Sequence, residues 1–111
     1  MNKVKVLIEG YAKVNSDGTW DATSTTTLID TGKYKIIMDP GCNRKLLLDA
    51  LEKEGLKTAD INYVFLSHYH PDHCLLMGIF ENATVYDSVQ WQKGPIGGDT
   101  PEILPGTNIK V

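Results

Sequence analysis

The sequence predicts an α/β fold, in which helices connect the strands of one sheet. Three observations support this prediction. The first third of the chain has the period-two pattern of strands, one later segment has a helical stripe of apolar residues, and a short apolar strand leads directly into a histidine-rich turn. With 111 residues, of which 41% are hydrophobic, residues 1–111 have the size and composition of one domain.

The N-terminal strands are expected to form an antiparallel meander. Alternating polar and apolar residues predict a half-buried strand over 4–14. A β-branched run predicts a second strand over 23–29, and residues 34–38 are expected to form a third. The turn sequence Asp39-Pro40-Gly41 ends the meander.

A helix is predicted over 44–54, because apolar side chains recur there at helical spacing. Asn43 is a suitable N-cap, and Gly55 is placed to end the helix. A short apolar strand over 61–66 follows and leads into the histidines.

The C-terminal part begins with a short helix predicted over 72–80, since Pro71 suits the first helical position. A strand is predicted over 84–86. The glycine-rich composition of 92–99 indicates a flexible surface loop, and residues 107–111 resemble the start of another strand.

Charge and hydropathy restrict the expected partners and location. The net charge is -3, and acidic and basic residues are scattered, so nucleic acid and anionic lipid are disfavoured as partners. No segment resembles a membrane span or a signal peptide, which predicts a soluble, cytoplasmic protein. Cys42 and Cys74 are too few for a disulfide framework, and we expect small buried side chains at both positions.

All three histidines of the chain lie within six residues. In extended backbone, residues two apart share a face, so His68 and His70 can direct both imidazoles toward one ion. Asp72 and His73 follow Pro71 and can reach a second ion nearby. Zinc accepts imidazole and carboxylate ligands, and two metals about 3.5–4 Å apart are a common hydrolytic device. The alternative, a surface loop that happens to contain histidines, remains open on composition alone.

The segment Ser67-His68-Tyr69-His70-Pro71-Asp72-His73 resembles the HxHxDH signature of the metallo-β-lactamase superfamily. The preceding order of strands, Asp-Pro-Gly turn, helix and strand is also similar to that family's opening. The resemblance implies an αββα sandwich, of which this chain covers the N-terminal half. It further implies that His68 and His70 bind one zinc ion, that Asp72 and His73 bind a second, and that Asp72 orients a metal-activated hydroxide. Iron and manganese are alternative metals.

The resemblance implies a metal-dependent hydrolase of an ester, lactone, thioester, lactam or phosphodiester bond. Two alternatives remain: an iron-dependent oxidoreductase on the same fold, and a non-catalytic metal-binding or dimerising half-domain. Diiron reductases of the family usually have glutamate where this chain has His70, which argues against that form of the first alternative.

Five residues near the motif each have two interpretations. Asp39 either orients a ligand imidazole or belongs only to a turn. Tyr69 and Trp91 could line a substrate pocket or cover core. Cys74 could be buried or serve as a substitute ligand. Leu75 stands where family members usually have glycine, so it could crowd the site.

The family's remaining ligands come from a second half that this sequence does not contain, since no histidine follows the motif. We therefore expect a half-domain that is weakly active or inactive alone. Its uncovered inner sheet face would carry Val4, Val6 and Ile8 or their neighbours, together with Ile36 and Val64. Leaving such side chains exposed forfeits about 1.5–3 kcal/mol each.

This expectation predicts that the chain forms a twofold-symmetric homodimer that buries the inner face, because a small domain has a margin of only about 5–15 kcal/mol. Sedimentation at micromolar concentration should give twice the mass of one chain. A stable monomer that unfolds cooperatively would contradict the prediction.

Overall fold

A computed structural model describes residues 2–111. The strands are β1 (Lys3–Ile8), β2 (Tyr11–Val14), β3 (Trp20–Thr23), β4 (Thr26–Asp30), β5 (Lys35–Met38), β6 (Tyr63–Phe65), β7 (Thr84–Tyr86), β8 (Gln90–Lys93) and β9 (Ile96–Asp99). The helices are α1 (Arg44–Lys53) and α2 (Pro71–Cys74), with single 3-10 turns at Thr58–Asp60 and Met77–Ile79. None of the helices formed by the described residues has the length and apolar composition that a membrane crossing requires.

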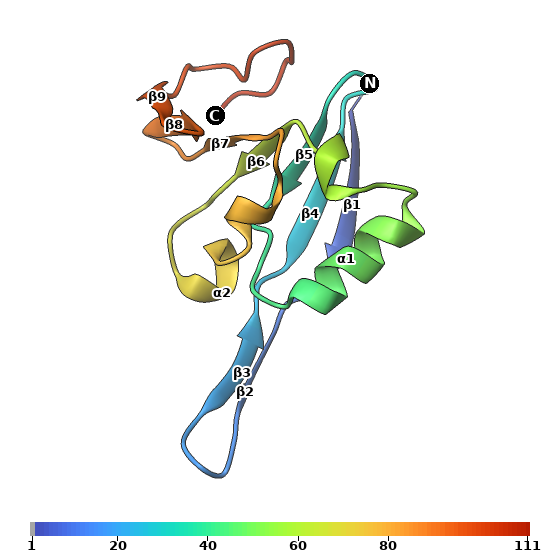
Figure 1. Ribbon diagram of the computed structural model, residues 1–111, viewed down its shortest axis with the longest axis vertical. Helices are drawn as coiled ribbons and strands as arrows, with labels where there is room; N and C mark the ends of the chain where they lie inside the picture. Colours follow the sequence, from blue (N-terminus) through green and yellow to red (C-terminus); the bar gives the residue numbers. More distant parts are fainter. Residues whose placement is uncertain (1) are drawn as a thin grey trace.

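Seven strands form one mixed sheet in the order β1-β4-β5-β6-β7-β8-β9, and β2 and β3 form a separate hairpin (Figure 1). The three strands β5, β6 and β7 are parallel, and the other neighbours in the sheet are antiparallel. Parallel neighbours need crossover connections, which contain α1 between β5 and β6 and α2 between β6 and β7. The predicted α/β arrangement is confirmed.

The larger core lies between the sheet and α1. Leu47 and Leu51 of α1 are 0% and 1% exposed. The helix begins where predicted, because the Asn43 side chain accepts a hydrogen bond from the Leu46 N–H at 3.1 Å. Gly55, at φ 72°, follows its end. The buried residues of this core are Ile8, Leu28, Ile37, Leu47, Leu51, Ile61, Val64, Leu66, Leu76, Phe80 and Ala83.

A smaller core lies on the opposite face of the sheet. It contains Ile36, Tyr63, Tyr86 and Leu104, and the Tyr63 and Tyr86 rings meet edge to face at 5.4 Å. Burial raises the pKa of Tyr63 to about 12, and its hydroxyl donates to the Pro105 carbonyl at 2.7 Å. The C-terminal segment 100–111 therefore covers part of this face through Leu104.

The sheet face with the smaller core corresponds to the expected inner face, and the strand register corrects the list of residues expected on it. Val4 and Val6 lie on this face and are 67% and 53% exposed. Ile36 also lies on it but is buried. A β-bulge between Val6 and Ile8 turns Ile8 to the helix side, where Val64 also packs.

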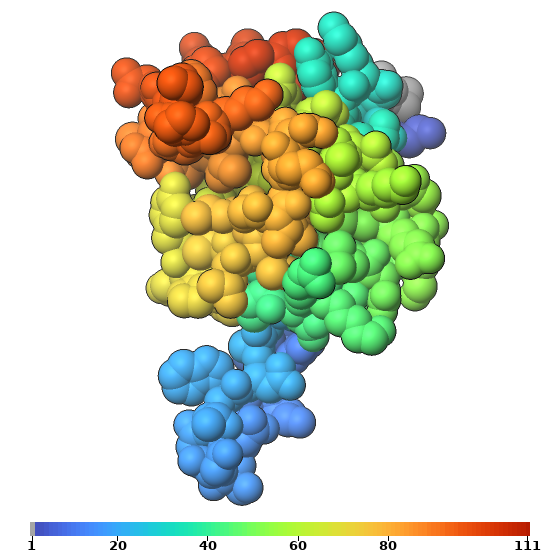
Figure 2. All heavy atoms as spheres, viewed as in Figure 1, coloured from blue at the N-terminus to red at the C-terminus, as the bar shows by residue number. Residues whose placement is uncertain are grey.

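The N-terminal strands differ from the prediction, because the expected strands over 4–14 and 23–29 are each interrupted. The two interruptions lie against each other: Gly10 N donates to Thr25 Oγ1 at 3.0 Å. A Cβ on Gly10 would lie only 2.5 Å from Thr25 N, so glycine permits this close approach. Beyond this point β2 and β3 project from the body as a hairpin (Figure 2).

The C-terminal predictions are wrong in three places. Residues 92–99 are not a loop but form most of the β8–β9 hairpin, which reverses at Gly94. A Cβ on Gly98 would lie 2.9 Å from the Trp91 indole, so glycine leaves room for that ring within the strand pair. Residues 107–111 make only a single bridge, between Lys110 and Ile103. The helix predicted over 72–80 is divided into α2 and a 3-10 turn.

Replacing Leu47 by alanine should lower the free energy of unfolding by about 2–5 kcal/mol, because it opens a cavity beneath α1. Leu46→Ala on the same helix, where the residue is 38% exposed, is the matched control and should cost far less. Chemical denaturation of the two variants measures the difference. Equal losses would contradict the packing described for α1.

Candidate metal centre

The histidine segment lies where three parallel strands end. Asp39 follows β5, Ser67 comes shortly after β6, and Asp87 follows β7. Because the carboxyl ends of parallel strands meet at one edge of a sheet, these side chains are brought together. The Asp39 N–H donates to the Phe65 carbonyl at 2.9 Å, which joins the first two strand ends directly. We call residues 67–73 the metal loop.

Asp39 is the main polar anchor of the metal loop. Its carboxylate accepts hydrogen bonds from Ser67 N at 2.8 Å and Ser67 Oγ at 2.6 Å, and its Oδ2 lies 3.0 Å from His73 Nδ1. The residue is 8% exposed and has φ 53°, a left-handed conformation that aspartate tolerates better than most residues. Its own carbonyl accepts from Thr26 Oγ1 at 2.7 Å. Asp39 therefore contacts a candidate ligand and does more than form a turn.

The contact with Asp39 determines which nitrogen of His73 faces outward. When His73 Nδ1–H donates to the carboxylate, the Nε2 lone pair is free to bind a metal. His73 Nε2 lies 3.6 Å from Asp72 Oδ2, so an imidazole nitrogen and a carboxylate oxygen are neighbours. This pair of donors fits zinc.

His68 and His70 lie beside this pair. The rings of His68 and His70 have centroids 4.6 Å apart, and the His68 and His73 rings are 4.1 Å apart. His68 Nδ1 lies 2.8 Å from Ser67 Oγ. The structure thus places all four predicted ligands in one cluster, but among residues 2–111 no three donor side chains are arranged around a common point that could hold a metal.

Backbone hydrogen bonds fix the second half of the metal loop. Ser24 N donates to the Asp72 carbonyl at 2.8 Å, and Gly41 N donates to the His73 carbonyl at 2.9 Å. Gly41 has φ 81°, and a Cβ there would lie 2.5 Å from Thr23 Oγ1, so the predicted Asp-Pro-Gly turn needs its glycine. The turn after β5 and the joint between β3 and β4 therefore hold the two candidate ligands Asp72 and His73.

Leu75 and Cys74 follow the metal loop, and their positions do not indicate a ligand role. Leu75 is 66% exposed and lies on the surface. Cys74 is half-buried, and its Sγ donates to the Tyr69 carbonyl at 3.4 Å. Cys42 is also half-buried, and its Sγ donates to the Ala22 carbonyl at 2.8 Å. Neither cysteine is fully buried, so the expectation for both positions is wrong.

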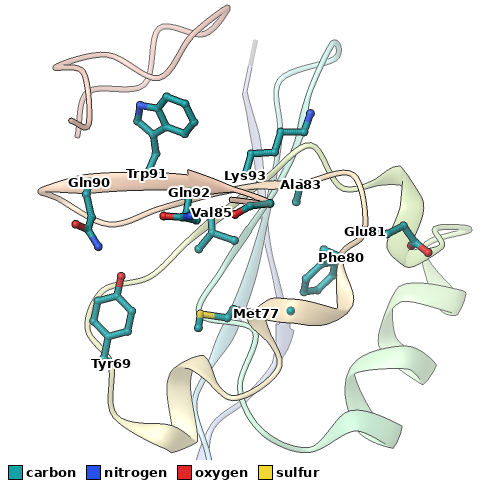
Figure 3. A pocket seen from close by; sticks show the side chains of 12 residues that line it. Tyr69, Met77, Phe80, Glu81, Ala83, Val85, Gln90, Trp91, Gln92 and Lys93 are labelled. Atoms are coloured by element: carbon teal, nitrogen blue, oxygen red, sulfur yellow. Dashed lines mark hydrogen bonds between the residues drawn. The ribbon is translucent and has the colours of Figure 1, made fainter. Parts of the chain in front are cut away.

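A pocket of about 500 Å³ lies beside the metal loop, between Tyr69 and β8 (Figure 3). Met77, Phe80 and Val85 form its apolar floor, and the Tyr69 ring borders it. The pocket interpretation of Tyr69 thus has geometric support. Trp91 also lines this pocket, although its indole points away from the floor and packs beside the smaller core.

Asp87 is a polar residue of this region that the sequence interpretation missed. Its carboxylate accepts a hydrogen bond from Tyr69 Oη at 2.5 Å, and this bond is the largest cause of the raised pKa of Tyr69. Burial acts to raise the pKa of Asp87, but hydrogen bonds from Tyr69, Gln90 and Val89 outweigh it and lower the pKa. The position of Asp87 directly after β7, at the same sheet edge as Asp39, is the signal that could have identified it.

Asp39→Asn should lower the free energy of unfolding by about 1–3 kcal/mol, because the amide cannot replace all three carboxylate contacts. Asparagine tolerates the left-handed backbone, so the change isolates the carboxylate. Asp49→Asn, an exposed carboxylate paired only with Lys45 on α1, is the control and should cost less than about 0.5 kcal/mol. Thermal or chemical denaturation decides, and an Asp39→Asn variant as stable as the wild type would contradict the anchor role.

Comparison with known proteins places these features in a family. The model of the metallo-beta-lactamase superfamily matches residues 19–89. Metallo-beta-lactamase domain-containing protein 1 of Xenopus laevis is 30% identical over 113 residues, which cover 95% of this chain and 48% of that protein. The chain thus spans about half the length of this curated relative.

Solved structures show the same similarity. A protein of Thermotoga maritima described as a metallo-beta-lactamase aligns with a TM-score of 0.70 at 29% identity, over 77% of this chain and 42% of that one. AidC, a dizinc quorum-quenching lactonase, aligns with a TM-score of 0.50 at 32% identity, over 60% of this chain and 26% of its own. The chain belongs to the metallo-beta-lactamase superfamily and has the fold of part of that domain.

Proposed function

We propose that this protein is a zinc-dependent hydrolase in which His68 and His70 bind one ion and Asp72 and His73 bind a second. The observation that carries the proposal is the contact between His73 Nδ1 and Asp39, 3.0 Å, which leaves Nε2 beside the Asp72 carboxylate. A carboxylate behind an imidazole fixes its tautomer and raises its basicity as a ligand. A surface histidine without a ligand role would not need this arrangement.

The candidate residues would have different roles in the reaction. Bound zinc would supply a Lewis acid and a water whose pKa is lowered to about 7. Asp72 would orient that water through its carboxylate, while Asp39 holds His73 in place. His68 and His70 are exposed, so their imidazoles are accessible to an ion arriving from solvent.

The substrate is proposed to be a small molecule with an ester, lactone, thioester, lactam or phosphodiester bond. The similarity to a dizinc lactonase supports both zinc and an ester-type bond. An iron-dependent redox protein and a purely metal-binding domain are the alternative outcomes of the experiments below.

The number of ligands limits what this chain can do alone. Four donors shared between two ions give each ion two protein ligands, whereas ordinary catalytic zinc has three. We therefore expect weak zinc binding and weak or absent hydrolysis by the isolated chain.

Zinc titration of the purified chain should show an affinity much weaker than that of a full-length relative. His68→Ala or His70→Ala should weaken it further by about tenfold or more, which corresponds to about 1.4 kcal/mol or more. Asp99→Asn, an exposed carboxylate on β9, controls for non-specific binding and should leave the titration unchanged. A tight stoichiometric site that both histidine changes leave intact would refute the assignment, and screening with lactone, thioester and phosphodiester substrates tests the hydrolase proposal.

A further inference from the structure

We infer that Tyr69 is a positioning residue for the metal loop: its hydroxyl, bonded to Asp87, holds the stretch that carries His68 and His70. The inference rests on the proposed function for its consequence in metal binding. The structural part concerns the metal-free chain and can be tested separately.

The two ends of the metal loop are anchored on one side of the molecule. Ser67 is held by the Asp39 carboxylate, at 2.8 and 2.6 Å. At the other end, the Asp72 carbonyl accepts from Ser24 N at 2.8 Å and the His73 carbonyl accepts from Gly41 N at 2.9 Å. All of these partners belong to the turn after β5 or to the joint between β3 and β4.

The middle of the loop, residues 68–71, lacks such anchors. Its remaining hydrogen bonds in residues 2–111 stay within the loop or the first turn of α2, such as His73 N to the His70 carbonyl at 2.9 Å. The bond from Tyr69 Oη to Asp87 Oδ2, at 2.5 Å, is the one hydrogen bond among the described residues that joins this middle part to another element. Tyr69 is also 53% exposed, so packing covers only part of the residue.

Asp87 is suited to act as a fixed anchor. Its Oδ1 accepts from Val89 N at 2.7 Å and Gln90 N at 2.8 Å. Its own N–H donates to the Gln90 carbonyl at 2.9 Å, and its carbonyl accepts from Thr100 Oγ1 at 2.7 Å. These bonds fix the turn between β7 and β8 and leave Oδ2 available to Tyr69.

The position of Tyr69 in the sequence explains how it acts on the ligands. The backbone at His70 is extended, with φ -63° and ψ 137°. In extended backbone a side chain projects opposite to its two neighbours, which would place the Tyr69 ring across the loop from the His68 and His70 imidazoles. The Tyr69 side chain accordingly points toward β8 at the edge of the pocket (Figure 3). Fixing Tyr69 on this side therefore fixes the direction of both imidazoles on the other.

The test compares Tyr69→Phe with the wild type in two measurements. In the metal-free protein, the backbone amides of His73 and Cys74, which both donate to the His70 carbonyl, should exchange hydrogen about tenfold faster, since a hydrogen bond to a charged group that holds the loop is lost. In a zinc titration, affinity should fall by a similar factor of about ten, because the disordered loop must be ordered on binding. Amides of α1 should exchange as in the wild type.

Tyr63→Phe is the matched control, because it also removes one phenol hydrogen bond, to the Pro105 carbonyl at 2.7 Å. It should affect the C-terminal segment but neither the loop amides nor the zinc titration. Asp87→Asn keeps an acceptor but removes the charge, so it should show a smaller effect of the same kind. Combining it with Tyr69→Phe should add little for the loop, because Asp87→Asn weakens the same bond that Tyr69→Phe removes.

Unchanged exchange of the His73 and Cys74 amides in Tyr69→Phe would overturn the inference. If the wild type binds no zinc, the proposed function fails while the exchange measurement still decides the role of Tyr69. If Tyr69→Phe does not fold, Asp87→Ala, which removes the acceptor altogether, takes its place, and wild-type exchange in that variant would count equally against the anchor.

Discussion

The buried carboxylate of Asp39 is the interaction on which the metal loop depends. A charged group that is 8% exposed must be compensated by partners, and here Ser67 and His73 supply them from both ends of the loop. Each partner satisfies the carboxylate and is itself fixed by it. The left-handed backbone at Asp39 directs the carboxylate toward the neighbouring strand end. The arrangement of candidate ligands is therefore a consequence of how one buried charge is satisfied.

The parallel order of β5, β6 and β7 makes this arrangement possible. Since the three strands run in the same direction, the residues that follow them share one sheet edge. Asp39 after β5 and Asp87 after β7 lie on either side of the loop that follows β6. One carboxylate holds the ends of the loop and the other holds its middle through Tyr69. An antiparallel neighbour at either side would have placed its carboxylate at the opposite edge.

Local features were predictable from the sequence, and long-range ones were not. The helix with its Asn43 cap, the Pro71 helical start and the strand over 84–86 each follow from residues within a few positions. The β8–β9 hairpin was missed because its glycines indicate a loop by composition, whereas in the structure Gly98 makes room for the Trp91 indole. The face of Ile8 depends on a bulge opposite β4, and the role of Asp87 depends on a residue in another connection. The orientation of Ile8 and the role of Asp87 are therefore both set by partners distant in sequence.

A metal site depends both on the number of its ligands and on their orientation. This chain supplies the orienting residues more completely than it supplies the ligands. The side chains that orient the candidate ligands, Asp39 and Asp87, both belong to the described residues and contact their targets. The donors are fewer than two zinc ions require. Losing an orienting carboxylate should therefore loosen the loop even in the absence of metal, whereas losing His68 or His70 should affect only binding. Because the first effect appears in the free protein and the second does not, the contribution of preorganisation can be measured in this chain independently of catalysis.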